Sequence, residues 1–260
     1  MKYVISNKTL VSNGTYFAKD DNVNGYLAVK VDPVGHEVLN DLVNGRTKES
    51  IFNTKCRFVK SMAFISNTSL QSITLLNCLS IYSSAFRDCI NLTSIAFPEC
   101  TYIGAYAFLS CTRLRNARFP VCAQLRTQAF QGCSALEEAF FPECSWVPAG
   151  AFGNCVSLSS VELSNCQGID NGAFQNCSML QNISLPQCSY IAQRAFENCI
   201  GLTHIYLLSD SVCRLESSGA FTNTPVESGS AEIHVPFDLW SEYISNSMWS
   251  CFSSIIFSNI

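Results

Sequence analysis

The sequence predicts a β-rich solenoid in which short coils of equal length stack into one elongated domain. The first observation is an Ala-Phe pair that recurs with a constant 22-residue period, except that the last copy comes slightly later. The phenylalanines of these pairs are Phe64, Phe86, Phe108, Phe130, Phe152, Phe174, Phe196 and Phe221. The second observation is a run of evenly spaced cysteines from Cys78 to Cys199, two in each repeat. A fixed period of this length indicates a repeat architecture in which each unit packs on its neighbours.

Each repeat opens with the pattern Leu-x-x-Ile-x-Phe, as at Leu92, Ile95 and Phe97. The last two apolar positions alternate with an outward one, which is typical of a strand with one buried side. A proline follows in several repeats, such as Pro98, and it ends the strand because it cannot donate to the ladder. We expect a second short strand near Tyr102 and Ile103. The Ala-Phe-x-x-Cys segment then leaves room for a single helical or 3-10 turn, because an average helix needs ~11 residues.

Both ends of such an array need caps, because an uncapped solenoid exposes its core and an open sheet edge. Residues 1–50 are predicted to form the N-terminal cap, with a strand over 25–31 and a helix over 35–44 that Gly45 ends. Residues 51–230 are predicted to form the repeat array. Residues 231–260 are predicted to form the C-terminal cap.

The chain has 15 cysteines, and all but Cys251 fall into two columns when the repeats are aligned. Disulfides between stacked neighbours are one interpretation, since their Cα atoms would lie ~4.4–6.8 Å apart, but each bridge would strain one coil against the next. Zinc is disfavoured because no Cys-x-x-Cys occurs. The favoured interpretation is small buried side chains whose thiols donate to carbonyls at the bends, in a reducing or anaerobic setting. Cys251, between Trp249 and Phe252, is expected in the core.

The composition argues against two classes of partner. The net charge is −4 and the basic residues form no run, which argues against nucleic acid. No apolar stretch reaches the ~18–20 residues that span a bilayer, and the N-terminus lacks the apolar run and cleavage site of a signal peptide. We therefore expect no membrane insertion, and a cytoplasmic or virion-associated location unless the protein is exported by another route.

Motifs that carry chemistry are not found in the sequence. The three histidines, His36, His204 and His234, have no metal-ligand spacing. The sequence contains no Gly-x-Ser-x-Gly elbow, phosphate loop or dinucleotide fingerprint. The sequence therefore predicts a non-enzymatic protein without a cofactor or a metal.

The complete repeat, read from Leu92 through Pro98, Cys100, Ile103 and Phe108 to Cys111, resembles the BspA-like branch of leucine-rich repeats in its cysteine-bearing 22-residue form. The pattern covers residues 64–221. The resemblance implies a right-handed leucine-rich-repeat solenoid with a parallel β-sheet on its concave face. It also implies an origin in a gut bacterium, one of its phages or an anaerobic protist, and it suggests an adhesion-type protein of the cell surface.

The outward positions of the predicted concave strands define a candidate interaction surface. The candidate residues are Arg115, Arg118, Glu137, Glu138, Phe140, Glu162, His204 and Tyr206. An exposed phenylalanine ringed by charges is typical of an interaction site, although the same charges can form cross-strand ion pairs. The leading hypothesis is a module that binds a protein or glycan ligand on this face. The alternative is a structural component of a phage virion or surface assembly in which the solenoid is a spacer.

A second set of exposed aromatic residues is predicted on the other flank of the coils. Its members are Tyr82, Tyr102, Tyr106, Trp146 and Tyr190. Such side chains can stack on sugars or dock a protein, and they can equally cover neighbouring coils. The second role is favoured.

Overall fold

The computed structural model describes residues 49–259 and, before them, the backbone of strands β1 (Val4–Ile5), β2 (Lys8–Val11), β3 (Thr15–Lys19), β4 (Tyr26–Val31) and β5 (Glu37–Leu39). Strands β1 to β5 pair antiparallel in chain order, and β5 pairs parallel with the first short strand of the array. Strand β4 confirms the strand predicted over 25–31. The helix predicted over 35–44 is wrong at Glu37–Leu39, where pairing with the array favours a strand, and its remaining residues lie outside the described ones.

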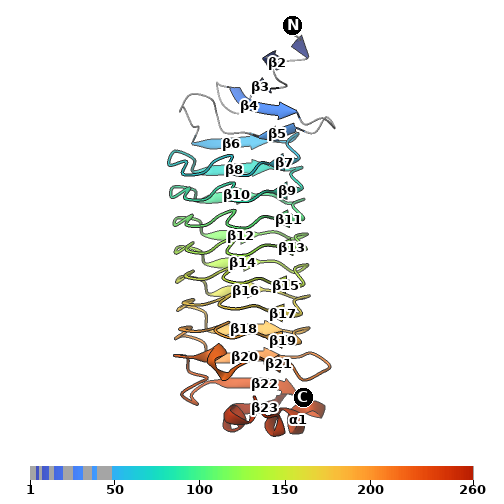
Figure 1. Cartoon of the computed structure of the whole chain (residues 1–260), viewed down its shortest axis with the longest axis vertical. Helices are drawn as coiled ribbons and strands as arrows, with labels where there is room; N and C mark the ends of the chain where they lie inside the picture. The colour runs from blue at the N-terminus through green and yellow to red at the C-terminus, as the bar shows by residue number, and fades with distance from the viewer. Residues whose placement is uncertain are drawn as a thin grey trace.

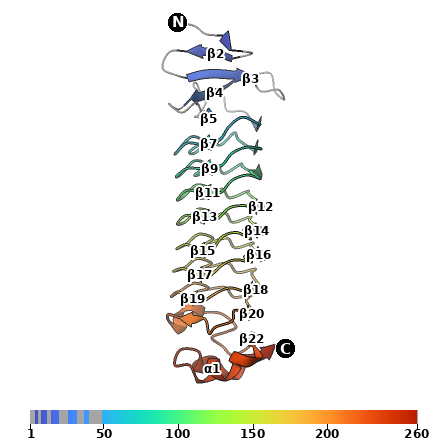
Figure 2. The same cartoon turned by 90° about the vertical axis from the view of Figure 1, so that its right-hand side faces the viewer.

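The rest of the chain is a column of stacked coils (Figures 1 and 2). The longer strand of each coil is β6 (Ser50–Asn53), β8 (Ser72–Leu75), β10 (Ser94–Ala96), β12 (Asn116–Arg118), β14 (Glu138–Phe140), β16 (Ser160–Glu162), β18 (Asn182–Leu185) or β20 (His204–Leu207). The shorter strand is β7 (Phe58–Val59), β9 (Ser80–Ile81), β11 (Tyr102–Ile103), β13 (Gln124–Leu125), β15 (Trp146–Val147), β17 (Gly168–Ile169), β19 (Tyr190–Ile191) or β21 (Arg214–Leu215). We call the two surfaces that they form the long-strand face and the short-strand face.

Equivalent residues of successive coils lie side by side. In the parallel pair β8 and β10, Ile73 lies opposite Ile95, its equivalent one repeat later in the sequence. The short strands follow the same register, with Ile81 opposite Ile103. The structure thus confirms the predicted stack of 22-residue coils and the short strand at Tyr102–Ile103.

The core is built from files of identical side chains. Phe86, Phe108 and Phe130 are fully buried, and their rings stack with centroids 5.1 and 4.9 Å apart and planes within 8°. A second file is packed against this one, with the Phe97 ring 5.9 Å from that of Phe86. Burial of each such side chain contributes ~1.5–3 kcal/mol, and each ring pair adds ~0.5–1.5 kcal/mol. Because every coil adds the same contacts to the next, the core is continuous along the column.

The segment around each Ala-Phe pair is a chain of hydrogen-bonded turns, which we call the turn face. The Ala107 amide donates to Gly104 within its own coil (3.3 Å), whereas the Phe108 amide donates to Ala129 of the next coil (2.7 Å). This alternation depends on residues with positive φ, such as Tyr106 (60°) and Ser110 (59°). Among the described residues only the last such segment, η1 (Ser218–Phe221), is a 3-10 helix. The expected 3-10 turn is therefore correct for the last coil alone.

The column cysteines are buried thiols, as predicted. In one column Cys111 donates its Sγ hydrogen to the carbonyl of Phe86 in the preceding coil (3.1 Å). In the other, Cys100 donates to Tyr102 (3.3 Å), and burial raises the pKa of the Cys100 thiol to about 12. Cys251 contradicts the expectation of a core position, because it is exposed and donates to the carbonyl of Met248 (3.2 Å).

The C-terminal end of the column is closed by β22 (Glu232–Pro236), η2 (Phe237–Leu239), α1 (Trp240–Ser245), η3 (Ser250–Ile255) and β23 (Ile256–Asn259). Trp249 is fully buried against Phe221, and its indole Nε1 donates to the carbonyl of Cys213 (2.6 Å). The Tyr243 hydroxyl accepts a hydrogen bond from the Cys213 amide (2.8 Å). These aromatic side chains cover the end of the phenylalanine file. In the described part of the chain, no helix has the length and apolar character needed to cross a membrane.

Candidate interaction surface

The centre of the long-strand face is formed by β12, β14 and β16. Side chains alternate along these strands, so that Ala117 points into the core while Arg118 points outward. The register places Arg118 opposite Phe140, and Phe140 opposite Glu162. These three predicted residues therefore form one outward row across three successive coils, at the ~4.8 Å spacing of paired strands.

Four charged side chains in and beside this row form two ion pairs across adjacent strands. Arg115 Nη1 lies 2.7 Å from Glu137 Oε1, and Arg118 forms an ion pair with Glu138. The guanidinium carbon of Arg118 also lies 4.3 Å from the centroid of the Phe140 ring, in a cation–π contact. Exposed ion pairs of this kind contribute only ~0.2–1 kcal/mol each to stability. Their main consequence is that the side chains of adjacent coils contact one another on this surface.

Glu162 differs from the other carboxylates of the cluster. Glu162 accepts a hydrogen bond from the hydroxyl of Ser164. It has no cationic partner among the described residues. The predicted cluster contains Arg115 and Arg118 against three glutamates, so its net charge is −1 (2 − 3). The unpaired charge thus lies at the Glu162 end of the outward row.

His204 and Tyr206 belong to a separate cluster. They lie on β20. One coil, that of β18, separates them from Glu162, and its outward residue Ser184 lies opposite Tyr206. Their neighbours on β22 are Glu232 and His234. The rings of Tyr206 and His234 stack with centroids 4.7 Å apart, and Glu232 Oε2 lies 3.0 Å from His234 Nε2 and 3.7 Å from His204 Nε2.

Sequence reasoning missed Glu232 and His234 as members of this surface. Glu232 pairs with His204 across a connection longer than one repeat, so counting along the sequence by the repeat period does not align the two strands. The signal present in the sequence was the alternation of Ile233, His234 and Val235, which predicts an outward histidine on a strand.

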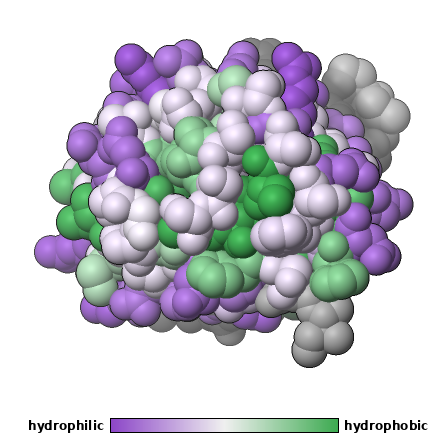
Figure 3. Space-filling model, turned by 90° about the horizontal axis from the view of Figure 1, so that it is seen from below, coloured by the Kyte–Doolittle hydropathy of each residue, from purple (hydrophilic) through white to green (hydrophobic). Residues whose placement is uncertain are grey.

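The aromatic side chains continue toward the C-terminal end of the column. The Phe257 ring lies 6.1 Å from that of His234 and is 45% exposed. Phe237 and Trp240 are also exposed, and Trp240 Nε1 donates to the carbonyl of Ile256 (3.1 Å). Seen from below, this end of the molecule has an apolar area near its middle, bordered by polar residues (Figure 3).

The aromatic residues of the short-strand face contact one another across coils. Trp146 and Tyr190 stack with ring centroids 5.8 Å apart, although Gly168 lies between them in the strand register. A Cβ atom on Gly168 would come within 2.3 Å of the Trp146 ring, so only glycine lets the indole lie across this position. Tyr82 and Tyr102 form a similar pair at 6.0 Å. These contacts correspond to the covering role that the sequence favoured.

The described residues contain no group of three or more histidine, cysteine or acidic side chains that could hold a metal ion. Burial raises the pKa of the Cys166 thiol to about 12, and it raises that of the Cys111 thiol as well. A nucleophilic cysteine needs the opposite shift, toward the thiolate at neutral pH. The Cys111 and Cys166 thiols are therefore structural groups.

The stacked parallel coils and their files of Leu, Phe and Cys define a leucine-rich-repeat solenoid. A family model described as the BspA-type leucine-rich repeat region, in six copies, matches residues 44–143 and 103–227. The chain therefore belongs to the BspA-type leucine-rich repeat family, as its resemblance in sequence predicted. No curated protein matches it.

Solved structures of bacterial proteins share the fold. A leucine-rich repeat protein from Bacteroides ovatus is similar with a TM-score of 0.55 and 20% identity over 82% of this chain and 66% of its own. The leucine-rich repeat protein of T. pallidum is similar with a TM-score of 0.54 and 19% sequence identity, and the match covers 76% of this chain and 86% of that protein. The pneumococcal vaccine antigen PcpA is similar with a TM-score of 0.50 and 16% sequence identity, and the match covers 96% of this chain and 49% of that protein. The chain thus spans slightly less than two thirds of the Bacteroides protein and about half of PcpA.

Proposed function

We propose that this protein is a non-enzymatic interaction module, of the adhesion type, that binds a protein or glycan partner on its long-strand face. Leucine-rich repeat proteins are generally interaction modules, which supports the class. The observation that carries the choice of surface is the outward row of Arg118, Phe140 and Glu162 on adjacent strands. It combines an aromatic anchor, an arginine and a carboxylate that has no cationic partner among the described residues.

The physical argument for this surface is its preorganisation. The parallel strands hold the Cα atoms of the row, and the ion pair with Glu138 together with the cation–π contact to Phe140 holds the Arg118 side chain. A partner that binds here immobilises few additional rotamers, and each rotamer that need not be ordered saves ~0.5–1.5 kcal/mol of binding free energy. Arginine and aromatic residues are enriched among the side chains that dominate binding energies.

The test compares two triple variants of equal size on the same face. The first carries Arg118→Ala, Phe140→Ala and Glu162→Ala. The control carries Thr74→Ala, Ser94→Ala and Ser184→Ala, which are not members of the charged cluster. The immobilised wild-type chain is used to capture partners from extracts of the source cells and of the surfaces that they colonise, and bound material is identified by mass spectrometry and glycan release.

We expect the first variant to lose at least ten-fold in affinity for the captured partner and the control to bind as the wild type does. Circular dichroism should show the same fold for all three chains. Unchanged binding by the first variant would refute the proposed surface. Failure of the wild type to retain any partner would refute the interaction role itself.

A further inference from the structure

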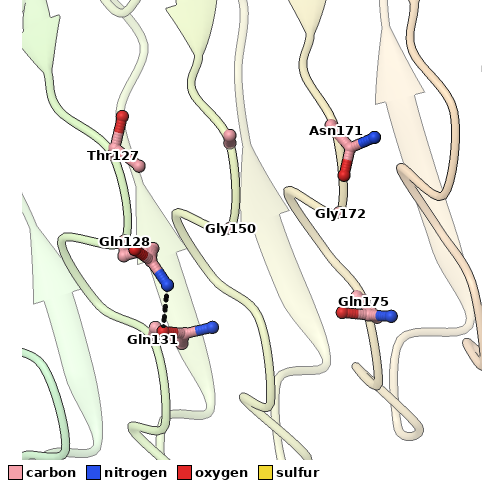
Figure 4. Close-up of a pocket in the computed structure, with 8 residues that line it drawn as sticks. Thr127, Gln128, Gln131, Gly150, Asn171, Gly172 and Gln175 are labelled. Atoms are coloured by element: carbon pink, nitrogen blue, oxygen red, sulfur yellow. Dashed lines mark hydrogen bonds between the residues drawn. The ribbon is translucent and has the colours of Figure 1, made fainter.

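A hollow of about 230 Å³ lies on the turn face, away from both strand faces (Figure 4). Three successive coils contribute to it. Gln128 and Gln131 line it on one side, Gly150 lies in the middle, and Asn171, Gly172 and Gln175 line it on the other side. The lining contains no ionisable side chain.

The hollow exists because two glycines replace side chains in a file that otherwise carries them. Gly150 and Gly172 have φ values of 62° and 59°. The equivalent residues of other coils adopt the same positive φ with full side chains, as Tyr106 (60°), Gln128 (56°) and Arg194 (59°) do. The backbone of these turns therefore does not require glycine, and what the two glycines provide is space.

The walls of the hollow offer hydrogen-bonding groups that the protein does not use. Gln128 Nε2 donates to Gln131 Oε1 (2.6 Å), which leaves Gln128 Oε1 and Gln131 Nε2 without a partner in the described part of the chain. The Asn171 side-chain amide has no hydrogen bond to any described residue. Gln175 donates to Glu197 and keeps its Oε1 at the hollow. The residues that carry these donors and acceptors lie on stacked coils that are hydrogen-bonded to one another.

We propose that this hollow, which we call the amide groove, binds a single neutral sugar unit. A side-chain amide presents a donor and an acceptor in one plane, and this arrangement matches the adjacent hydroxyls of a pyranose ring. The volume is equivalent to seven or eight waters at ~30 Å³ each, which is enough for one hexose. Because the groove carries no charge, an acidic sugar has no cationic partner in it. The groove and the long-strand face are separate sites, so this proposal stands independently of the proposed function.

The test fills the groove without altering the backbone. A Cβ atom on Gly172 would meet its nearest neighbour, in the Gln175 side chain, at 3.6 Å, which is an ordinary contact. Asparagine is suitable because Asn154 and Asn176 adopt positive φ in this chain. The test variant is therefore Gly172→Asn. The matched control is Gly132→Asn, which places the same side chain at another positive-φ glycine outside the groove.

Binding is measured by saturation-transfer NMR and by titration of ¹⁵N-labelled protein with the methyl glycosides of glucose, galactose, mannose and N-acetylglucosamine, and with N-acetylneuraminic acid as the acidic comparison. We expect at least one neutral glycoside to bind and to shift the amide signals of Gly150 and Gly172. Gly172→Asn should weaken this binding at least ten-fold, whereas Gly132→Asn should leave it unchanged. The proposal is overturned if no neutral glycoside binds the wild-type chain, if Gly172→Asn binds as well as the wild type, or if only the acidic sugar binds.

Discussion

Replacement of Phe130 by alanine tests how strongly the aromatic file holds the column together. The Phe130 ring is fully buried between those of Phe108 (4.9 Å) and Phe152 (5.6 Å). It also packs at an angle against Phe119 (5.9 Å) and Phe141 (5.6 Å). Removal of a buried phenylalanine side chain costs ~3–5 kcal/mol, depending on how far the surroundings collapse into the cavity. Because the strands fix the coils on both sides, we expect little collapse and a loss of ~5 kcal/mol.

The assay is urea unfolding followed by circular dichroism, with the free energy of unfolding obtained by linear extrapolation. The control is Phe140→Ala, because Phe140 is a half-buried phenylalanine of the outer surface and should lose less than ~1 kcal/mol. Hydrogen exchange should also show the greatest loss of protection in the coils next to Phe130, since each repeat contacts only its neighbours. A loss of ~1 kcal/mol or less for Phe130→Ala, or equal losses for both variants, would contradict the reasoning.

Three further predictions concern close packing and the thiols. Gly104→Ala should destabilise the protein by ~1–3 kcal/mol in the same urea assay, because its Cβ would lie 2.5 Å from the backbone nitrogen of Ser83, and wild-type stability would contradict this contact. In the native protein Cys251 alone should react with a thiol reagent, whereas all 15 cysteines should react in urea. Mass spectrometry counts the modified cysteines, and several modified cysteines in the native protein would disprove the buried columns. Burial raises the pKa of Cys100 from 9.0 to about 12, so the folded chain retains a proton that the unfolded chain releases between these values. The free energy of unfolding should therefore be highest below pH 9. It should fall by ~1.4 kcal/mol per pH unit for each such thiol as the pH rises toward 12. A flat profile in this range would be inconsistent with thiol burial.

The repeating part of the fold could be predicted because periodicity translates directly into register. Once coils of equal length are stacked, Ile95 must lie beside Ile73, and the cysteines must form columns. The turn face could not be predicted in the same way. Residues such as Tyr106 and Ser110 have no sequence preference for positive φ, and it is the hydrogen bonds to the next coil that stabilise this conformation.

The candidate site was predictable in its backbone and less so in its contacts. Alternation along the strands predicted the outward positions of Arg118 and Phe140. It did not predict that Phe140 is half-buried, because the stacking of Arg118 on its ring depends on side-chain rotamers. Irregular spacing concealed the second cluster, because Glu232 follows His204 by more than one repeat length. Residues 35–44 were predicted as a helix from local sequence, whereas at Glu37–Leu39 pairing with the array determined a strand.

Equivalent residues form straight rows along the stack of coils, and distances between spin labels measure this arrangement. Labels attached to cysteines introduced at Thr74, Glu162 and Tyr206, in a Cys251→Ser background, lie on one outward row. At ~4.8 Å per coil, we expect ~19 Å between the first two labels, which are four coils apart, and ~29 Å between the first and the last, which are six coils apart. Distances that do not increase in proportion to the number of coils would contradict this arrangement.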